Sequence, residues 1–187
     1  MQVRRGGVAL LGLVAACGCS TPAPDRPEAE PPPAEQSRSA ARPLSLADIS
    51  PGDTVALVRL MESLMADGDR ALELSVRRDT TVPAVLVDQP RQLSLWLFDD
   101  HPVKLVASEA DAEGRMTSET LVWFHGGEVS VVQAPFSMHL FDGDRLVLTT
   151  DEGMMPLEPT DEVRTQLERS IIDSVKVRLA AFGVRYP

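Results

Sequence analysis

The chain has 187 residues, of which 43% are hydrophobic and 25% charged, a composition typical of a globular protein and not of a disordered one. Its formal net charge is -10, and a surface that acidic repels phosphate backbones, so we expect no nucleic-acid partner. Aromatic residues make up only 4% of the chain, so the core is expected to consist mainly of Leu, Val and Met.

The first sixteen residues have the pattern of a secretion signal. Arg4 and Arg5 give a positive start, and an apolar run from Val8 to Ala16 ends in small residues. This run is far shorter than the ~20 apolar residues that span a bilayer, which favours a signal peptide over a membrane helix. Residues 1–16 are therefore predicted to be a signal peptide.

The residues from Leu13 to Cys17, L-V-A-A-C, resemble the lipobox of bacterial lipoproteins, in which cleavage falls just before a Cys that becomes diacylated. The resemblance implies that Cys17 is the lipid anchor and that the protein meets a membrane through its acyl chains, because two or three chains hold stably where one does not. Cys19 is an alternative anchor, and a plain signal peptide with two incidental cysteines is an alternative to the lipobox. Gly18, in place of Asp, resembles the class sorted to the outer membrane. The implied location is the cell envelope, at the outer membrane facing the periplasm if the organism has two membranes.

Composition divides the rest of the chain in two. Residues 17–43 carry the lipidated Cys and are dense in Pro without apolar periodicity, which predicts a disordered, semi-extended tether. Residues 44–187 are predicted to form a single domain. Because no Cys lies in that domain, it cannot contain a disulfide.

Two helices are predicted at the ends of the domain. Asp53 or Thr54 can cap the first, which we expect to end at Asp67-Gly68. Thr160 can cap a long C-terminal helix, and Gly183 is its expected stop.

Between the helices the pattern changes to that of strands. Ala71 to Arg77 and Val82 to Val87 are predicted strands, and Pro83 indicates an edge position for the latter. One phrase then occurs three times, in Ser94–Val106, Thr120–Val132 and Ser137–Thr149. Each copy has apolar residues up to a Phe, four mostly polar residues and an apolar residue five after the Phe, which predicts a hairpin with a four-residue loop.

The predicted fold class is therefore α+β, an antiparallel β-meander of about 5–8 strands with an N-terminal helix and a long C-terminal helix packed on one face. The expected core face holds the Phe of each repeat and its neighbours at alternate positions: Trp96, Phe98, Val103, Leu105, Val122, Phe124, Val129, Val131, His139, Phe141, Leu146 and Leu148.

The opposite face is too apolar for an ordinary solvated face. Three explanations remain open: another segment such as Val82 to Val87 covers it, it is partly exposed without a role, or it is a binding surface. The third hypothesis gives an interaction surface of Leu97, Trp123 and Leu140, because exposed aromatic and aliphatic clusters mark interaction sites.

The residues that could carry chemistry form no recognisable motif. The histidines His101, His125 and His139 are too far apart in sequence for a metal motif, and His139 is expected to be a buried histidine. Asp99-Asp100 and Asp142 to Asp144 could meet calcium in turns, but Asp is also a favoured turn residue and the EF-hand series is missing. With no nucleophile elbow and no phosphate-binding loop, we predict no catalytic residue, no metal and no cofactor.

The leading hypothesis is a non-catalytic, lipid-anchored envelope protein that presents an acidic α+β domain to another envelope component, either a protein or a polymer. A lipoprotein that holds a small ligand in an apolar cavity is the first alternative. A hydrolase with a site of scattered carboxylates is the second.

Overall fold

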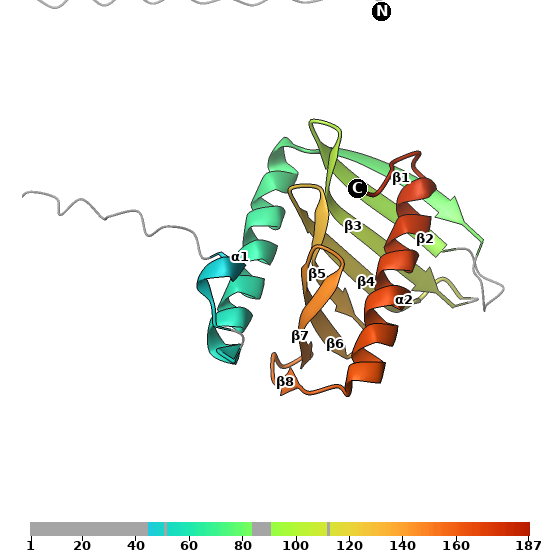
Figure 1. Ribbon diagram of the computed structural model, residues 1–187. Coiled ribbons are helices and arrows are strands. Elements are labelled where there is room, and N and C mark those ends of the chain that lie inside the picture. Colours follow the sequence, from blue (N-terminus) through green and yellow to red (C-terminus); the bar gives the residue numbers. More distant parts are fainter. Residues whose placement is uncertain (1–44, 51, 84–90, 112) are drawn as a thin grey trace, which may run out of the picture. The chain divides into compact units, whose positions relative to one another are not determined.

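The computed structural model describes residues 45–50, 52–83, 91–111 and 113–187, which all belong to one compact unit, Arg42–Pro187 (Figure 1). The predicted signal peptide, both cysteines and the tether lie outside the described residues, as does most of the predicted strand from Val82 to Val87. None of the described helices is both long enough and apolar enough to cross a membrane.

The described residues form an eight-stranded antiparallel sheet with one long helix before it and one after it, which confirms the predicted α+β meander. The order of the strands in the sheet is their order in the chain, so each described strand pairs only with its neighbours in sequence. The helices are α1 (Thr54–Ala71) and α2 (Asp161–Ala180), and short 3-10 turns lie at Leu46–Asp48 and Leu72–Leu74. The strands are β1 (Val76–Val82), β2 (Arg91–Phe98), β3 (His101–Ala110), β4 (Met116–His125), β5 (Glu128–Ala134), β6 (Ser137–Asp142), β7 (Arg145–Asp151) and β8 (Pro156–Leu157).

Helix α1 begins where the sequence predicts and ends later. The side chain of Asp53 caps it by accepting a hydrogen bond from the backbone N–H of Ala56 at 3.0 Å. The predicted end at Gly68 was wrong, because the helix continues to Ala71 and the first strand begins only at Val76. A Cβ atom on Gly68 would lie 2.7 Å from Cδ1 of Trp123, so this glycine serves a close contact between helix and sheet.

Helix α2 matches its prediction at both ends. The hydroxyl of Thr160 accepts a hydrogen bond from the backbone N–H of Val163. After the last turn, Gly183 has a φ of 73°, and the N–H of Val184 returns to the carbonyl of Leu179 at 3.1 Å.

The three repeats form hairpins with two-residue turns, so the predicted four-residue loops were wrong. The last pairs before the turns are Phe98 with His101, His125 with Glu128 and Asp142 with Arg145. In the first two hairpins both turn residues have positive φ: 48° and 62° at Asp99 and Asp100, 62° and 90° at Gly126 and Gly127. Such turns match the natural twist of the paired strands, and both Asp and Gly tolerate the left-handed conformation.

Each of these hairpins also contains a one-residue bulge close to its turn. The bulged residues, which have no opposite residue on the neighbouring strand of the hairpin, are Val103, Ser130 and Val147. Each lies in the second strand of its hairpin. A bulge shifts the alternation of side chains by one position. Val131 and Leu148 therefore leave the predicted core face and pack on the other one.

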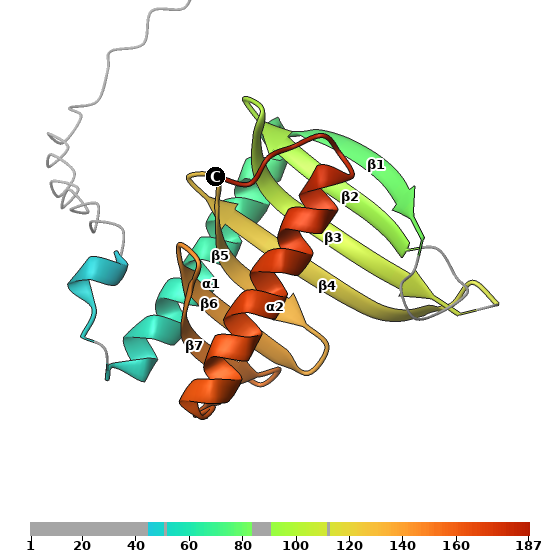
Figure 2. The same cartoon turned by 45° about the vertical axis from the view of Figure 1, so that its right-hand side comes forward.

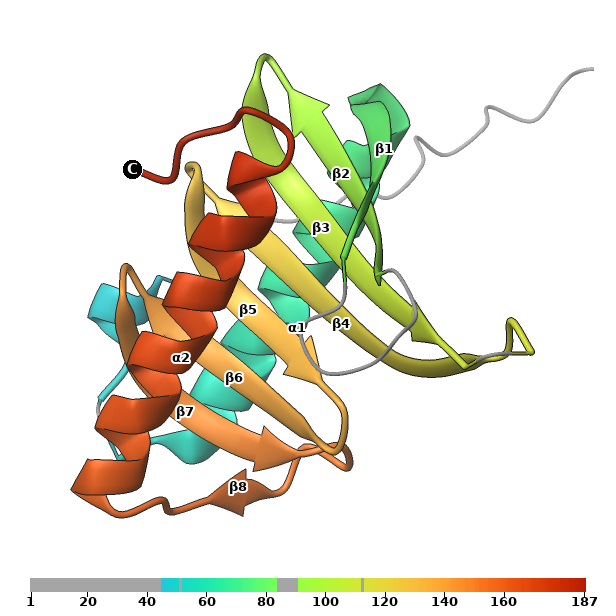
Figure 3. The ribbon, with the colours of Figure 1, turned by 90° about the vertical axis from the view of Figure 1, so that its right-hand side faces the viewer.

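The bulges help make both faces of the sheet apolar, and a separate helix covers each (Figures 2 and 3). Helix α2 contributes Ile172, Val175 and Leu179 to one core cluster, whereas α1 contributes Leu57, Leu60 and Met61 to the other. The prediction that both helices pack on one face was therefore wrong. On the sheet, the α2 cluster contains Leu95, Leu97, Leu105, Val122, Phe124, Val129, Val132, Phe141 and Leu146; the α1 cluster contains Trp123, Val131, Met138, Leu140 and Leu148.

Polar contacts fix Trp123 beneath α1. Its indole N–H donates to Oδ1 of Asp69 at 2.8 Å, and Lys104 donates to the same oxygen at 2.7 Å while its Nζ lies 4.4 Å from the centre of the Trp123 ring. Burial raises the pKa of Asp69, but the hydrogen bonds from Lys104 and Trp123 and the charge of Lys104 together bring it below its ordinary value. The ring is thus held by its polar edge as well as by packing.

Replacing Gly68 by Ala tests this contact. In an exposed helix Gly→Ala stabilises by roughly 0.5–1 kcal/mol, but here the added methyl meets an indole ring that cannot move aside. We expect the free energy of unfolding in urea to fall by about 1–3 kcal/mol. Gly52→Ala is the matched control, because a Cβ there has no atom within 4 Å, and it should leave stability unchanged or slightly raised. A stabilised Gly68→Ala variant would contradict the close packing.

A candidate binding groove beside helix α1

The predicted interaction surface of Leu97, Trp123 and Leu140 does not exist in the folded domain. These side chains are 4%, 2% and 0% exposed. Trp123 and Leu140 lie under α1, and Leu97 belongs to the cluster under α2. The prediction was wrong because α1 covers Trp123 and Leu140 and α2 covers Leu97, so all three side chains pack in the core instead of meeting a partner.

An exposed groove lies instead along α1, at the end of the sheet that carries the turns of the three hairpins. Two cavities of about 410 and 380 Å³ adjoin there and share Leu64, Asp67 and His125. Besides these shared residues, the larger cavity is lined by Ser45, Leu46, Leu60, Ser63, Glu128, Val129, Ser130, Leu140, Phe141, Asp142 and Gly143. The smaller cavity is lined in addition by Gly68, Ala71, Phe98, Asp99, His101, Pro102, Val103, Phe124, Gly126 and Gly127. We call these cavities together the α1 groove.

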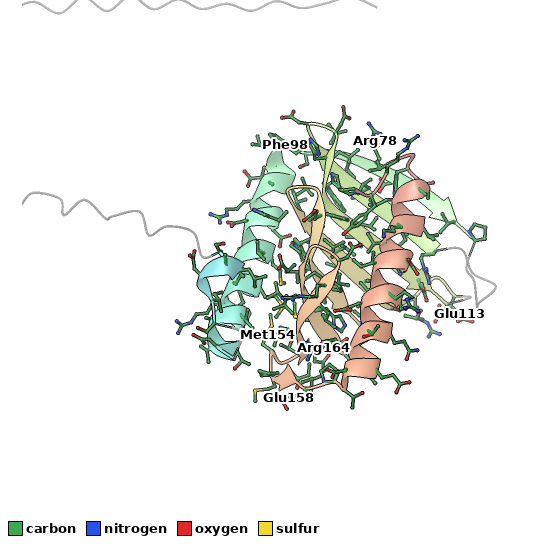
Figure 4. All side chains as sticks on the ribbon, in the orientation of Figure 1. Arg78, Phe98, Glu113, Met154, Glu158 and Arg164 are labelled. Atoms are coloured by element: carbon green, nitrogen blue, oxygen red, sulfur yellow. The ribbon has the colours of Figure 1, made fainter. Side chains whose placement is uncertain are left out.

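The floor of the α1 groove is apolar. Leu60 and Leu140, two buried members of the α1 cluster, line it, and Leu64 lies half-buried on its α1 side. Phe98, at the last position of β2, is 42% exposed and lies near the C-terminal end of α1 (Figure 4). An exposed aromatic ring over an apolar floor is typical of a contact site.

The rim of the groove is acidic. Four carboxylates line it, from Asp67, Asp99, Glu128 and Asp142, and none of its described lining residues is a lysine or an arginine. Arg70 pairs with Asp67 from the exposed surface of α1, which leaves three of the four without an ion pair among the described residues. A cleft lined by charge of one sign concentrates ligands of the opposite sign, so the groove favours cationic groups.

The histidines and carboxylates of the groove do not converge on a metal site. His101 and His125 both line it, but within the described ranges no group of three or more His, Cys, Asp and Glu side chains is arranged to hold a metal ion. The turn carboxylates at Asp99-Asp100 and Asp142 to Asp144 belong to no such group.

The C-terminal segment also contacts the hairpin turns at this end of the sheet. The hydroxyl of Tyr186 donates to Asp144 at 2.8 Å and accepts from the backbone N–H of Val129, and Lys176 lies 3.5 Å from Asp144. Burial, followed by the bond to Asp144, raises the pKa of Tyr186 to about 12, so its hydroxyl stays protonated at neutral pH. These contacts hold the hairpin turns in place beside the groove.

One pair in the domain resembles a nucleophile with its base. The Oγ atom of Ser137 lies 3.0 Å from Nε2 of His139, whose Nδ1 lies 3.3 Å from the hydroxyl of Thr149. A catalytic triad places a carboxylate at that third position, where it stabilises the imidazolium; a hydroxyl cannot do so. The geometry therefore satisfies a buried histidine, as the sequence predicts for His139, which is 3% exposed.

Comparison with known proteins adds no relative. Scans of the chain against protein-family models, curated proteins and solved structures find no match. The α1 groove was not found from the sequence because its residues come from α1 and from three different hairpins. The clustering of Asp and Gly at the predicted turns was the only signal for it.

The burial of His139 predicts a specific sensitivity to acid. Burial lowers its pKa in the folded state below the ordinary value of 6.5, so the unfolded chain binds the proton first and stability falls as pH drops through that value. We expect the urea midpoint of the wild type to fall between about pH 7.5 and about pH 5.5, and that of His139→Gln to fall less. An equal fall in both proteins would contradict the assignment to His139.

Proposed function

We propose that this chain is a non-catalytic, lipid-anchored protein of the bacterial cell envelope whose domain binds a basic, partly apolar segment of another envelope protein. The observation that carries the proposal is the α1 groove, with four carboxylates around an apolar floor and no lining lysine or arginine. A basic segment with an apolar side chain matches both properties of the groove.

The shape and chemistry of the groove favour a macromolecular partner over an enclosed small ligand. Its two cavities follow one another along α1, both are lined in part by hairpin-turn residues, and each carries charged groups. Pockets for apolar small molecules are mostly enclosed and have few polar groups. An exposed aromatic residue next to apolar side chains, with polar groups around them, is common at protein contacts, and Phe98 is such a residue here.

The anchor rests on the resemblance of the first seventeen residues to a lipoprotein signal. A lipidated Cys17 at the start of the Pro-rich stretch 17–43 would hold the domain near the membrane while allowing it to reach partners. We propose the outer membrane, on its periplasmic side, if the organism has two membranes. The net charge of the whole chain is -10, and acidic surfaces are repelled by anionic lipid headgroups.

Affinity capture with paired variants tests the binding proposal. The full chain, purified in detergent, is used to capture proteins from solubilised envelope, and Phe98→Ser is compared with Val177→Ser, which changes a 72% exposed residue of α2 away from the groove. We expect a basic partner that Val177→Ser retains and Phe98→Ser loses at least about tenfold. Its retention should weaken as salt is raised, because the rim charges are screened.

Two outcomes would overturn this proposal. The first is equal capture by both variants, provided both have the wild-type unfolding midpoint. The second is a captured partner whose binding segment is acidic, because that segment would be repelled by the rim of the groove.

Metabolic labelling tests the anchor independently of any partner. We expect labelled palmitate to be incorporated into the wild type and into Cys19→Ser, and incorporation to be lost in Cys17→Ser. Labelling that persists in Cys17→Ser and is lost in Cys19→Ser would show that Cys19, and not Cys17, is the lipidated residue. No labelling of the wild type would contradict the lipoprotein assignment.

A further inference from the structure

Two arginines and one glutamate form a separate charged cluster on the α2 face of the sheet. Arg91 at the start of β2 pairs with Glu109 near the end of β3. Their side chains are only 23% and 27% exposed. Arg178, in the last turn of α2, is near enough for the charges of both residues to act on it. The cluster has two positive charges and one negative charge in a chain that is otherwise strongly acidic.

Arg178 has no counterion within this cluster. It makes no hydrogen bond and no ion pair with the described residues, because Glu109 is engaged by Arg91. The Nε atoms of Arg91 and Arg178 are both buried without a hydrogen-bond partner. Buried polar groups in proteins are nearly always paired, so each unpaired donor needs an explanation.

The guanidinium of Arg178 does not become neutral at neutral pH, so its unpaired buried charge is not removed by loss of a proton. Burial and the neighbouring charge of Arg91 lower the pKa of Arg178 to about 10, while Glu109 raises it again in part. At neutral pH Arg178 therefore remains charged, half-buried and beside a second guanidinium. A charge in this position is stable when an anion accepts its hydrogen bonds.

We propose that Arg178 and Arg91 form a binding site for a small oxyanion, a phosphate or carboxylate group, on the α2 face of the sheet. Planar guanidinium groups match the spacing of oxygens in such groups, and each can donate two parallel hydrogen bonds. A single negative charge would bring the cluster to neutrality. The acidic surroundings favour a small free ion over a charged membrane surface.

Calorimetric titration of the full chain in detergent tests this site, with inorganic phosphate and acetate as probes at constant ionic strength. Arg178→Met keeps the aliphatic stem and removes the guanidinium, and Arg169→Met is the control on an exposed position of the same helix. We expect phosphate, acetate or both to bind the wild type and Arg169→Met equally, and the affinity to fall at least about tenfold in Arg178→Met.

A second variant separates binding from mere support of the fold. Glu109→Gln removes the only negative charge of the cluster, so it should bind the anion several-fold more tightly than the wild type even if it unfolds more easily. Absence of binding to the wild type would overturn the proposal. So would affinity that is unchanged in Arg178→Met, or lower in a folded Glu109→Gln.

Discussion

The rest of the structure depends on a one-residue bulge that occurs in each of the three repeated hairpins. In each hairpin it lies in the second strand, just after the two residue pairs nearest the turn. By adding one residue to the second strand, the bulge moves apolar side chains such as Val131 and Leu148 to the second face of the sheet. A sheet that is apolar on both faces is stable in water only when both are covered. The two helices therefore lie on opposite sides, and the domain has three layers.

This arrangement determines where a partner can bind. Both faces of the central strands are covered by helices, so the proposed partner site lies outside them, at the hairpin turns and along the flank of α1. There the turn residues with positive φ are Asp and Gly, which tolerate that conformation, and one of them, Asp99, is also one of the four rim carboxylates of the groove. The Arg178 cluster lies on the α2 face and carries charge of the opposite sign, so the two proposed sites would select different ligands.

Much of the fold could be predicted from the sequence because its signals are local. The caps at Asp53 and Thr160, the glycine after α2 and the three hairpins each depend on residues close together in the chain. The face assignments could not be predicted, because a single bulge reverses alternation and leaves no mark in the pattern of apolar residues. The end of α1 was wrongly predicted at Gly68 for a related reason. This glycine allows close contact with Trp123, which is more than fifty residues away in the sequence. The groove joins α1 to three hairpins, so only the folded chain reveals it.

The central claim, that α1 covers one face of the sheet while α2 covers the other, can be tested through the accessibility of Trp123. The chain has two tryptophans, so the Trp96→Phe variant leaves Trp123 as the only indole. In that variant we predict that iodide hardly quenches tryptophan fluorescence of the folded protein and quenches it strongly once urea has unfolded the domain. Equal quenching in the folded and unfolded states would show an exposed Trp123 and contradict the three-layer arrangement.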